Sequence, residues 1–436
     1  MVLHQDLLSL KRIYLLYYAR ERNMIFLKCY QDIVEAIQNQ ENRNRSGVSV
    51  YIENAHQLLC DQKSKQRLHE LLSNRTVTKL TIDDYISPVL EPDNSNSISI
   101  RNSKLHIENL ASLMAVLRSL EDLNLKHLTL SGNLESLAVS VSSKLQNVEI
   151  FKCRLKRSEG SLKAFAQSLA NRPLLEQVDI IDLSFPGEQQ LDICSMVATI
   201  CENKTLKKLS VSGLPNNDSS GFHHVCQAIR ASASLQSVVF GDILTNKMLG
   251  FVAEIISGNQ TLKELFITAN AGEDFVPVLE ALSSQNALAR ISIYAIPTMT
   301  TRTKQNKSTA MISVPSITML LESLQSKNYT LQDININGYP LSTYMYDGSS
   351  YVPLSRDLGN ELEFYLNLNR DLSSAITRKR LLVDEQYTAA EFVNDLSSYM
   401  QHHQHSRIRS SSADSEVVHL SAIFSLLSVK PRVWLY

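Results

Sequence analysis

Histidines and cysteines are the residues of this sequence best suited to chemistry, but their spacing matches no known catalytic or metal-binding motif. The densest group is His402, His403 and His405, which lies in a polar linker rich in Ser and Arg. Structural metal sites instead take ligands from fixed positions on two sides of the ion. The chain also lacks phosphate-binding glycine loops, nucleophile elbows and zinc-protease motifs. We therefore expect a non-enzymatic protein without catalytic residues, metal or cofactor.

The cysteines and the charge balance narrow the class of protein further. Six cysteines are scattered without a CxxC pair, at positions 29, 60, 153, 194, 201 and 226. This pattern favours reduced structural thiols and an intracellular, cytoplasmic protein. The chain contains no run of 18 apolar residues, so the sequence predicts no membrane span. Its first residues do not resemble a signal peptide. The net charge of -1 argues against a dedicated nucleic-acid binder.

A short apolar phrase recurs through the chain and must set the positions of all other residues. The phrase has the pattern apolar-x-x-apolar-x-apolar, in which x stands for any residue. Its copies start at Leu145, Leu175, Leu206, Leu235, Leu262, Leu288 and Leu331, between 26 and 43 residues apart. A period in this range predicts a solenoid, and the apolar spacing is that of leucine-rich repeats.

One repeat shows how the phrase predicts local structure. Val178 and Ile180 flank Asp179, which is the alternation of a strand with one buried face. Apolar residues then recur at helical spacing from Leu191 to Ile200, before Leu206 restarts the phrase. A single strand and helix cannot bury their apolar faces alone, so successive copies must stack. We expect parallel strands on the inside of a curve and helices on the outside.

The ends of the helices carry a family resemblance. The segments "TICENKTLKKL" and "IISGNQTLKEL" pass from an apolar helix through Asn to the next strand, and "YLNLNR" at 365–370 closes the array. These features resemble the ribonuclease-inhibitor-like class of leucine-rich repeats over about residues 47–372. The resemblance implies an α/β horseshoe with an Asn or Cys three residues after each strand's last apolar position. Asn133, Cys153 and Asn270 fit that position, but other copies carry Leu, Ile or Tyr there.

The remaining segments are predicted to flank the repeats. Residues 1–46 read as a helical cap, or alternatively as an independent helical pair that binds a partner. Residues 47–372 form the repeat array, and residues 373–436 read as a C-terminal helical cap or a small binding module. Between positions 77 and 145 the copies are irregular, and the phrase Leu125-Leu128-Leu130 predicts a strand there with Thr129 on its open face.

The exposed strand positions and two long loops are the predicted working surface. The loop at 297–315 is basic, and the loop after Ile336 is rich in Tyr; insertions at equivalent points of neighbouring repeats emerge on one edge. Tyr and Arg are enriched where partners bind. The predicted partner-binding residues are Phe266, Tyr294, Arg302, Lys304, Tyr344, Tyr346 and Tyr351.

The predicted function is therefore a scaffold that binds another protein, with no small-molecule substrate. An alternative is a substrate-recognition adaptor of a ubiquitin-ligase-type complex that docks through its terminal helices. A free-standing array of degenerate repeats is also similar to effectors that intracellular bacteria inject, which would place it in the host cytoplasm.

Overall fold

The structure is a computed structural model that describes about three fifths of the chain. The described residues are 24–27, 48–53, 58–59, 61–73, 77–83, 104–132, 134–140, 142–156, 161–184, 191–214, 219–270, 273–296, 314–346 and 351–371. They form an α/β fold with mostly parallel strands, arranged in two compact units that divide between Ala228 and Ile229. Each unit is described separately below.

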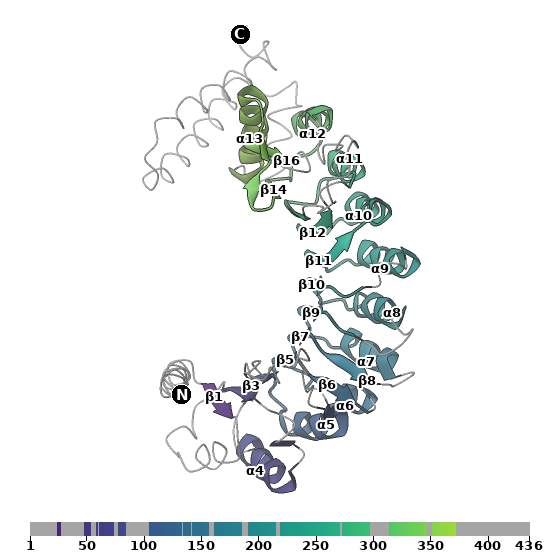
Figure 1. Cartoon of the computed structure of the whole chain (residues 1–436), viewed down its shortest axis with the longest axis vertical. Helices are drawn as coiled ribbons and strands as arrows, with labels where there is room; N and C mark the ends of the chain where they lie inside the picture. Colours follow the sequence, from purple (N-terminus) through teal and green to yellow (C-terminus); the bar gives the residue numbers. More distant parts are fainter. Residues whose placement is uncertain are drawn as a thin grey trace, which may run out of the picture. The chain divides into compact units, whose positions relative to one another are not determined.

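The N-terminal unit alternates strands and helices (Figure 1). Its strands are β1 (Met24–Leu27), β2 (Val48–Glu53), β3 (Val77–Asp83), β4 (Lys104–His106), β5 (Asp122–Lys126), β6 (Thr129–Ser131), β7 (Asn147–Phe151), β8 (Arg154–Lys156), β9 (Gln177–Ile181) and β10 (Lys208–Val211). Its helices are α4 (Gln62–Ser73), α5 (Ile107–Val116), α6 (Leu134–Ser140), α7 (Ser161–Ala170), α8 (Leu191–Ile200) and α9 (Ser219–Ala231), which crosses the division.

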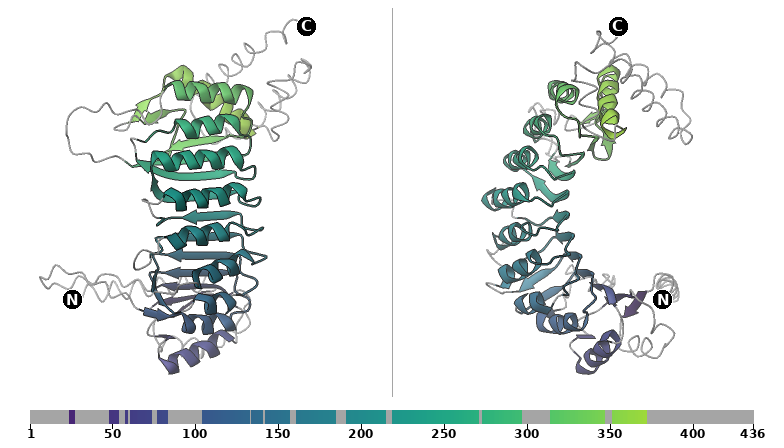
Figure 2. Two further views of the ribbon diagram at one scale, coloured as in Figure 1. Left: turned by 90° about the vertical axis from the view of Figure 1, so that its right-hand side faces the viewer. Right: turned by 180° about the vertical axis from the view of Figure 1, so that it is seen from behind.

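Two parallel sheets result from this alternation. The larger has the order β1-β2-β3-β5-β7-β9-β10, and the smaller has the order β4-β6-β8. Parallel neighbours need a crossover connection, and the helices supply it on one side of the larger sheet (Figures 1 and 2). Strand β1 lies inside the segment predicted as a helical cap; the rest of residues 1–46, apart from Met24–Leu27, lies outside the described residues.

The C-terminal unit repeats the same order of elements. Its strands are β11 (Ser237–Leu244), β12 (Glu264–Asn270), β13 (Arg290–Ile296), β14 (Asp333–Ile336), β15 (Tyr339–Pro340), β16 (Tyr344–Tyr346) and β17 (Tyr351–Pro353). Its helices are α10 (Asn246–Gly258), α11 (Val276–Ser284), α12 (Val314–Ser326) and α13 (Arg356–Asp371). Strands β11 to β14 are parallel, whereas β15 turns back antiparallel on β14 and β16 pairs with β17 as a hairpin.

The apolar phrase supplies the core as predicted. In α10 the buried residues Met248, Leu249, Val252, Ile255 and Ile256 recur at helical spacing. Leu265 and Ile267 of β12 are buried on the side of the helices. The segment "YLNLNR" at 365–370 lies in helix α13, where Tyr365 is fully buried.

One predicted strand is in the wrong register. The chain contains two overlapping copies of the phrase, and the sheet uses Leu120-Leu123-Leu125 instead of Leu125-Leu128-Leu130. Thr81 therefore lies opposite Asn124, which in turn lies opposite Glu149. Thr129 belongs to the smaller sheet and is buried, so it is not on the open face.

Asparagines at the ends of helices connect successive strand–helix pairs. The Nδ2 group of Asn203 donates to the carbonyls of Leu169, Ala170 and Arg172, and its Oδ1 accepts from the amides of Thr205 and Leu206. The same contacts recur in the C-terminal unit. There they are made by Asn259 toward Ile229 and Ser232, and by Asn328 toward Leu282. The recurring "Asn-x-Thr-Leu" of the sequence is thus a hydrogen-bonding device rather than a simple helix stop.

Candidate functional site

The open face of each larger sheet is the first candidate for a functional surface. In β5, β7 and β9 buried residues alternate with half-exposed ones, because successive side chains of a strand point to opposite faces. The buried face lies toward the helices. The other face carries side chains that the core does not require, so their chemistry is informative about function.

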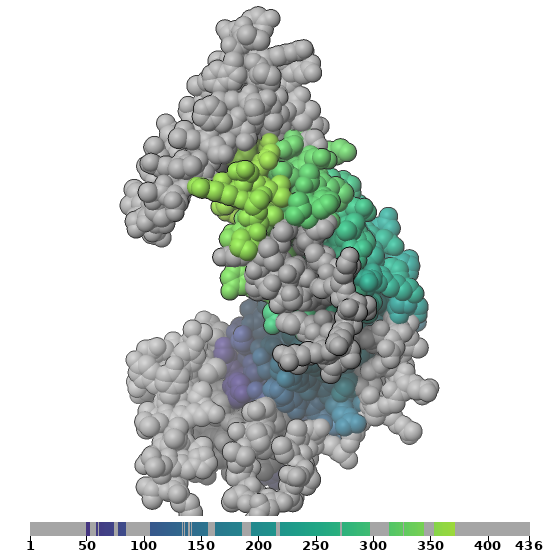
Figure 3. Space-filling view, turned by 45° about the horizontal axis from the view of Figure 1, so that its top comes forward, coloured from purple at the N-terminus to yellow at the C-terminus, as the bar shows by residue number. Residues whose placement is uncertain are grey.

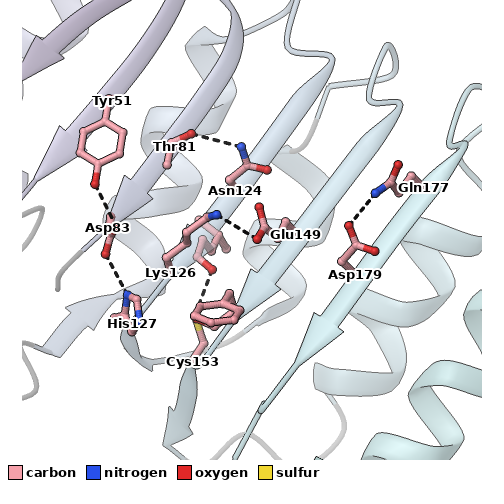
Figure 4. A network of polar contacts seen from close by, with 12 residues as sticks. Tyr51, Thr81, Asp83, Asn124, Lys126, His127, Glu149, Cys153, Gln177 and Asp179 are labelled. Atoms are coloured by element: carbon pink, nitrogen blue, oxygen red, sulfur yellow. Dashed lines mark hydrogen bonds and ion pairs between the residues drawn. The ribbon is translucent and has the colours of Figure 1, made fainter. Parts of the chain in front are cut away.

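In the N-terminal unit this open face is polar (Figure 4). The carboxylate of Asp83 accepts a hydrogen bond from the Tyr51 hydroxyl at 2.9 Å, and its other oxygen lies 2.9 Å from Nδ1 of His127. These three residues come from β2, β3 and the residue after β5. Strand pairing therefore places a carboxylate between a phenol and an imidazole.

Further polar pairs cover the neighbouring strands. Lys126 forms an ion pair of 2.9 Å with Glu149, and Gln177 donates to Asp179 at 2.7 Å (Figure 4). The second oxygen of Asp179 is buried without a hydrogen-bond partner among the described residues. Most of the polar groups on this face are satisfied by their neighbours within the sheet.

The Tyr51–Asp83–His127 chain resembles the carboxylate–imidazole pair of a general base. Such a pair acts only on a nucleophile within its reach. The thiol of Cys153 instead lies 3.4 Å from the Leu125 carbonyl, and burial raises its pKa to about 12. It therefore stays protonated at neutral pH and is a poor nucleophile.

The described residues offer neither a metal-binding cluster nor a membrane-spanning helix. Those residues contain no group of three His, Cys, Asp or Glu side chains placed to hold a metal ion. None of the described helices is long and apolar enough to cross a bilayer. Cysteines 153, 194, 201 and 226 are buried free thiols, whereas Cys29 and Cys60 lie outside the described residues.

The open face of the C-terminal unit carries exposed aromatic side chains among polar ones. Phe266 on β12 is 37% exposed and Tyr294 on β13 is 52% exposed. Phe266 pairs with Ser292, so Tyr294, two residues further along β13, is its diagonal neighbour. Thr268 lies between Ile243 and Tyr294 in the pairing and is only 6% exposed, although it is on this face. Large side chains thus gather around a sheltered threonine.

The predicted binding residues have different outcomes. Phe266 and Tyr294 come together as described, and Tyr344, Tyr346 and Tyr351 lie in the hairpin β16–β17, where Tyr346 pairs with Tyr351. Arg302 and Lys304 fall outside the described residues. The hairpin follows β14 and β15 in the chain, so the Tyr-rich segment has regular structure of its own.

Sequence reasoning missed two exposed apolar residues on the strands of this unit. Tyr339, which is 49% exposed, starts the antiparallel strand β15, a turn that the repeat pattern does not predict. Ile243 is exposed because β11 changes register between Phe240 and Ile243, which places Ile243 level with Thr268. β11 runs on to Leu244, past the last apolar residue of its phrase, Phe240, and only the structure shows this extension. We name Ile243, Phe266 and Tyr294 the aromatic face.

In the space-filling view the described residues of the C-terminal unit are coloured from teal to yellow-green (Figure 3). No protein-family model and no curated protein matches the sequence.

Proposed function

We propose that the chain is a leucine-rich-repeat solenoid of the ribonuclease-inhibitor-like kind that binds another protein without catalysis. Two findings support the repeat assignment. The asparagine contacts of Asn203 recur at Asn259 and Asn328, and each accompanies a threonine that donates to the preceding strand–helix pair. Successive strands also pair in parallel with the apolar phrase in register.

The aromatic face carries the proposal for binding. Exposed Phe and Tyr side chains on rigid strands cost solvation free energy that the fold does not recover. Their neighbours on the opposite face of the same strands are fully buried, so these aromatics are not needed for the core. Large aromatics supply much of the binding energy at protein interfaces, and strands hold them with little loss of conformational entropy. The partner is therefore expected to bury Phe266 and Tyr294.

A photo-crosslinking experiment tests this proposal. The photoreactive residue p-benzoylphenylalanine replaces Tyr294, and the full chain is irradiated in a cytoplasmic lysate. One lysate comes from the producing cell and the other from a host cell, because the protein is proposed to act in the cytoplasm of one or the other. The matched control carries the same residue in place of Leu174, an exposed apolar residue of the N-terminal unit.

The expected result is a discrete crosslinked protein with the probe at 294 that is missing with the probe at 174. Phe266→Ala should weaken binding of that protein by about tenfold or more, since a central aromatic anchor contributes about 1.4 kcal/mol or more. The same substitution should change the free energy of unfolding by less than about 0.5 kcal/mol. Identical products from both probe positions would refute the proposal.

A further inference from the structure

A second surface, in the N-terminal unit, gathers positive charge around one aromatic ring. The ammonium groups of Lys126 and Lys152 lie 5.9 Å and 5.2 Å from the centre of the Phe151 ring. The imidazole of His127 contacts the same ring edge-on, at 5.3 Å between centres. Lys126 and His127 follow one another at the end of β5, as Figure 4 shows. We name Lys126, Phe151, Lys152 and Arg154 the basic cluster.

Two of these cations have no carboxylate partner among the described residues. Lys126 is paired with Glu149, and His127 is paired with Asp83. Lys152 and Arg154 are both exposed, and they alternate with the buried residues Cys153 and Leu155. A contact with an aromatic ring holds an ammonium group in place without neutralising its charge. The cluster thus presents an ordered positive charge to solvent.

The backbone at Lys152 holds a conformation that is unusual for a lysine. His127, Lys152 and Asp182 each follow a strand of the larger sheet, and all three have left-handed φ values of 54°, 51° and 53°. The equivalent residue after β10 is Gly213, with φ of 84°. Glycine adopts this conformation freely and His and Asp tolerate it, but Lys has no local bond to offset the strain. Conformational strain at a charged, exposed residue is typical of functional positions.

We propose that the basic cluster binds an acidic segment of a partner protein. Lys152 and Arg154 lie on either side of the buried Cys153, and both are exposed, so neighbouring acidic side chains of such a segment can each meet one cation. The guanidinium of Arg154 suits a bidentate carboxylate. A nucleic acid would need a longer cationic stripe than two uncompensated charges.

This inference does not depend on the aromatic face, because the basic cluster lies in the other unit. Both surfaces fit a protein-binding scaffold, but either can fail alone. The test therefore uses a defined probe instead of the partner sought by crosslinking.

Fluorescence anisotropy with short labelled peptides tests the inference on the full chain. One peptide alternates Glu and Ala, a second replaces Glu by Gln, and a third probe is a short DNA duplex. At low salt the Glu peptide should bind at least about tenfold more tightly than the Gln peptide, and rising salt should weaken it. Lys208→Gln is the matched control, because Lys208 is an exposed lysine on a strand of the same unit.

Lys152→Gly and Arg154→Gln should each weaken binding of the Glu peptide by about fivefold to tenfold, whereas Lys208→Gln should not. Lys152→Gly should not lower the melting temperature, because glycine relieves the left-handed strain. Equal binding of the Glu and Gln peptides, absence of binding, or tighter binding of the DNA duplex would each overturn the inference. So would unchanged binding by Arg154→Gln, which keeps the side-chain stem and removes only the charge.

Discussion

Replacing Asn259 by Ala should cost more free energy than removing an ordinary core contact. Its side chain is 2% exposed and makes five hydrogen bonds of 3.0 Å or less. Nδ2 donates to the carbonyls of Ile229 and Ser232 at 2.7 and 3.0 Å. Oδ1 accepts from the Thr261 amide and hydroxyl, at 2.8 and 3.0 Å, and from the Leu262 amide at 2.8 Å. The two bonds from Nδ2 join segments that are distant in the chain. The three bonds to Oδ1 hold the turn that leads into the next strand.

The expected loss follows from these contacts. A typical hydrogen bond contributes about 1 kcal/mol net, and each buried backbone group left without a partner costs about 1–3 kcal/mol. Relaxation and water entry recover part of this sum, so we expect about 3–5 kcal/mol. Asn259→Asp keeps the acceptor but points a carboxylate oxygen at two carbonyls. It should therefore be at least as destabilising near neutral pH, and less so in acid.

Urea denaturation followed by circular dichroism measures the loss, and hydrogen–deuterium exchange locates it. Exchange should rise most in peptides that span Ile229–Leu235 and strand β12. Asn203→Ala should produce the corresponding change near 169–175 in the other unit. The matched control is Asn171→Ala, because Asn171 is exposed at the end of α7. A loss below about 1 kcal/mol for Asn259→Ala, or one equal to the control, would refute the reasoning.

Three further predictions concern a backbone conformation, the thiols and pH. Gly213→Ala should destabilise the protein by about 1–2 kcal/mol, because φ is 84° and an added Cβ would lie 3.2 Å from a backbone carbon. Gly250 lies in a helix with open space around it, so Gly250→Ala should stabilise the protein by up to about 1 kcal/mol. Thermal melts compare the two variants. Burial raises the pKa of Cys153 and of Cys201 to about 12, so iodoacetamide should label neither thiol in the folded protein and both in denaturant, as mass spectrometry would show. Burial, followed by a nearby lysine, lowers the pKa of His69 below its usual 6.5. As pH falls, His69 therefore takes up its proton in the unfolded chain before it does so in the folded protein. The folded state keeps its full stability above about pH 6.5 and loses part of it below that pH. His69→Gln should flatten this part of the pH–stability curve, and an unchanged curve would contradict the assignment.

The sequence predicted the strand–helix alternation well where the apolar phrase stands alone. Around Leu125 two overlapping copies of the phrase are equally apolar, and hydrophobicity cannot choose between them. The pairing of Asn124 with Thr81 and Glu149 makes that choice, and it depends on residues distant in the chain.

The candidate surfaces were only partly predictable for a similar reason. Phe266 and Tyr294 stood out because a strand does not need aromatics at open positions. The basic cluster was invisible, because the predicted register did not bring Lys126 beside Phe151. The contact of their side chains arises only once β5 and β7 pair in the register that the structure shows.

The asparagine contacts also have a direction, which matters while the protein is being made. The side-chain amides of Asn203, Asn259, Asn328 and Asn369 all donate to carbonyls earlier in the chain, up to 46 residues before them. A growing polypeptide therefore already holds the acceptors when each asparagine leaves the ribosome. Every new strand–helix pair can attach to the part already made without waiting for later residues, so the pairs can be added progressively along the chain.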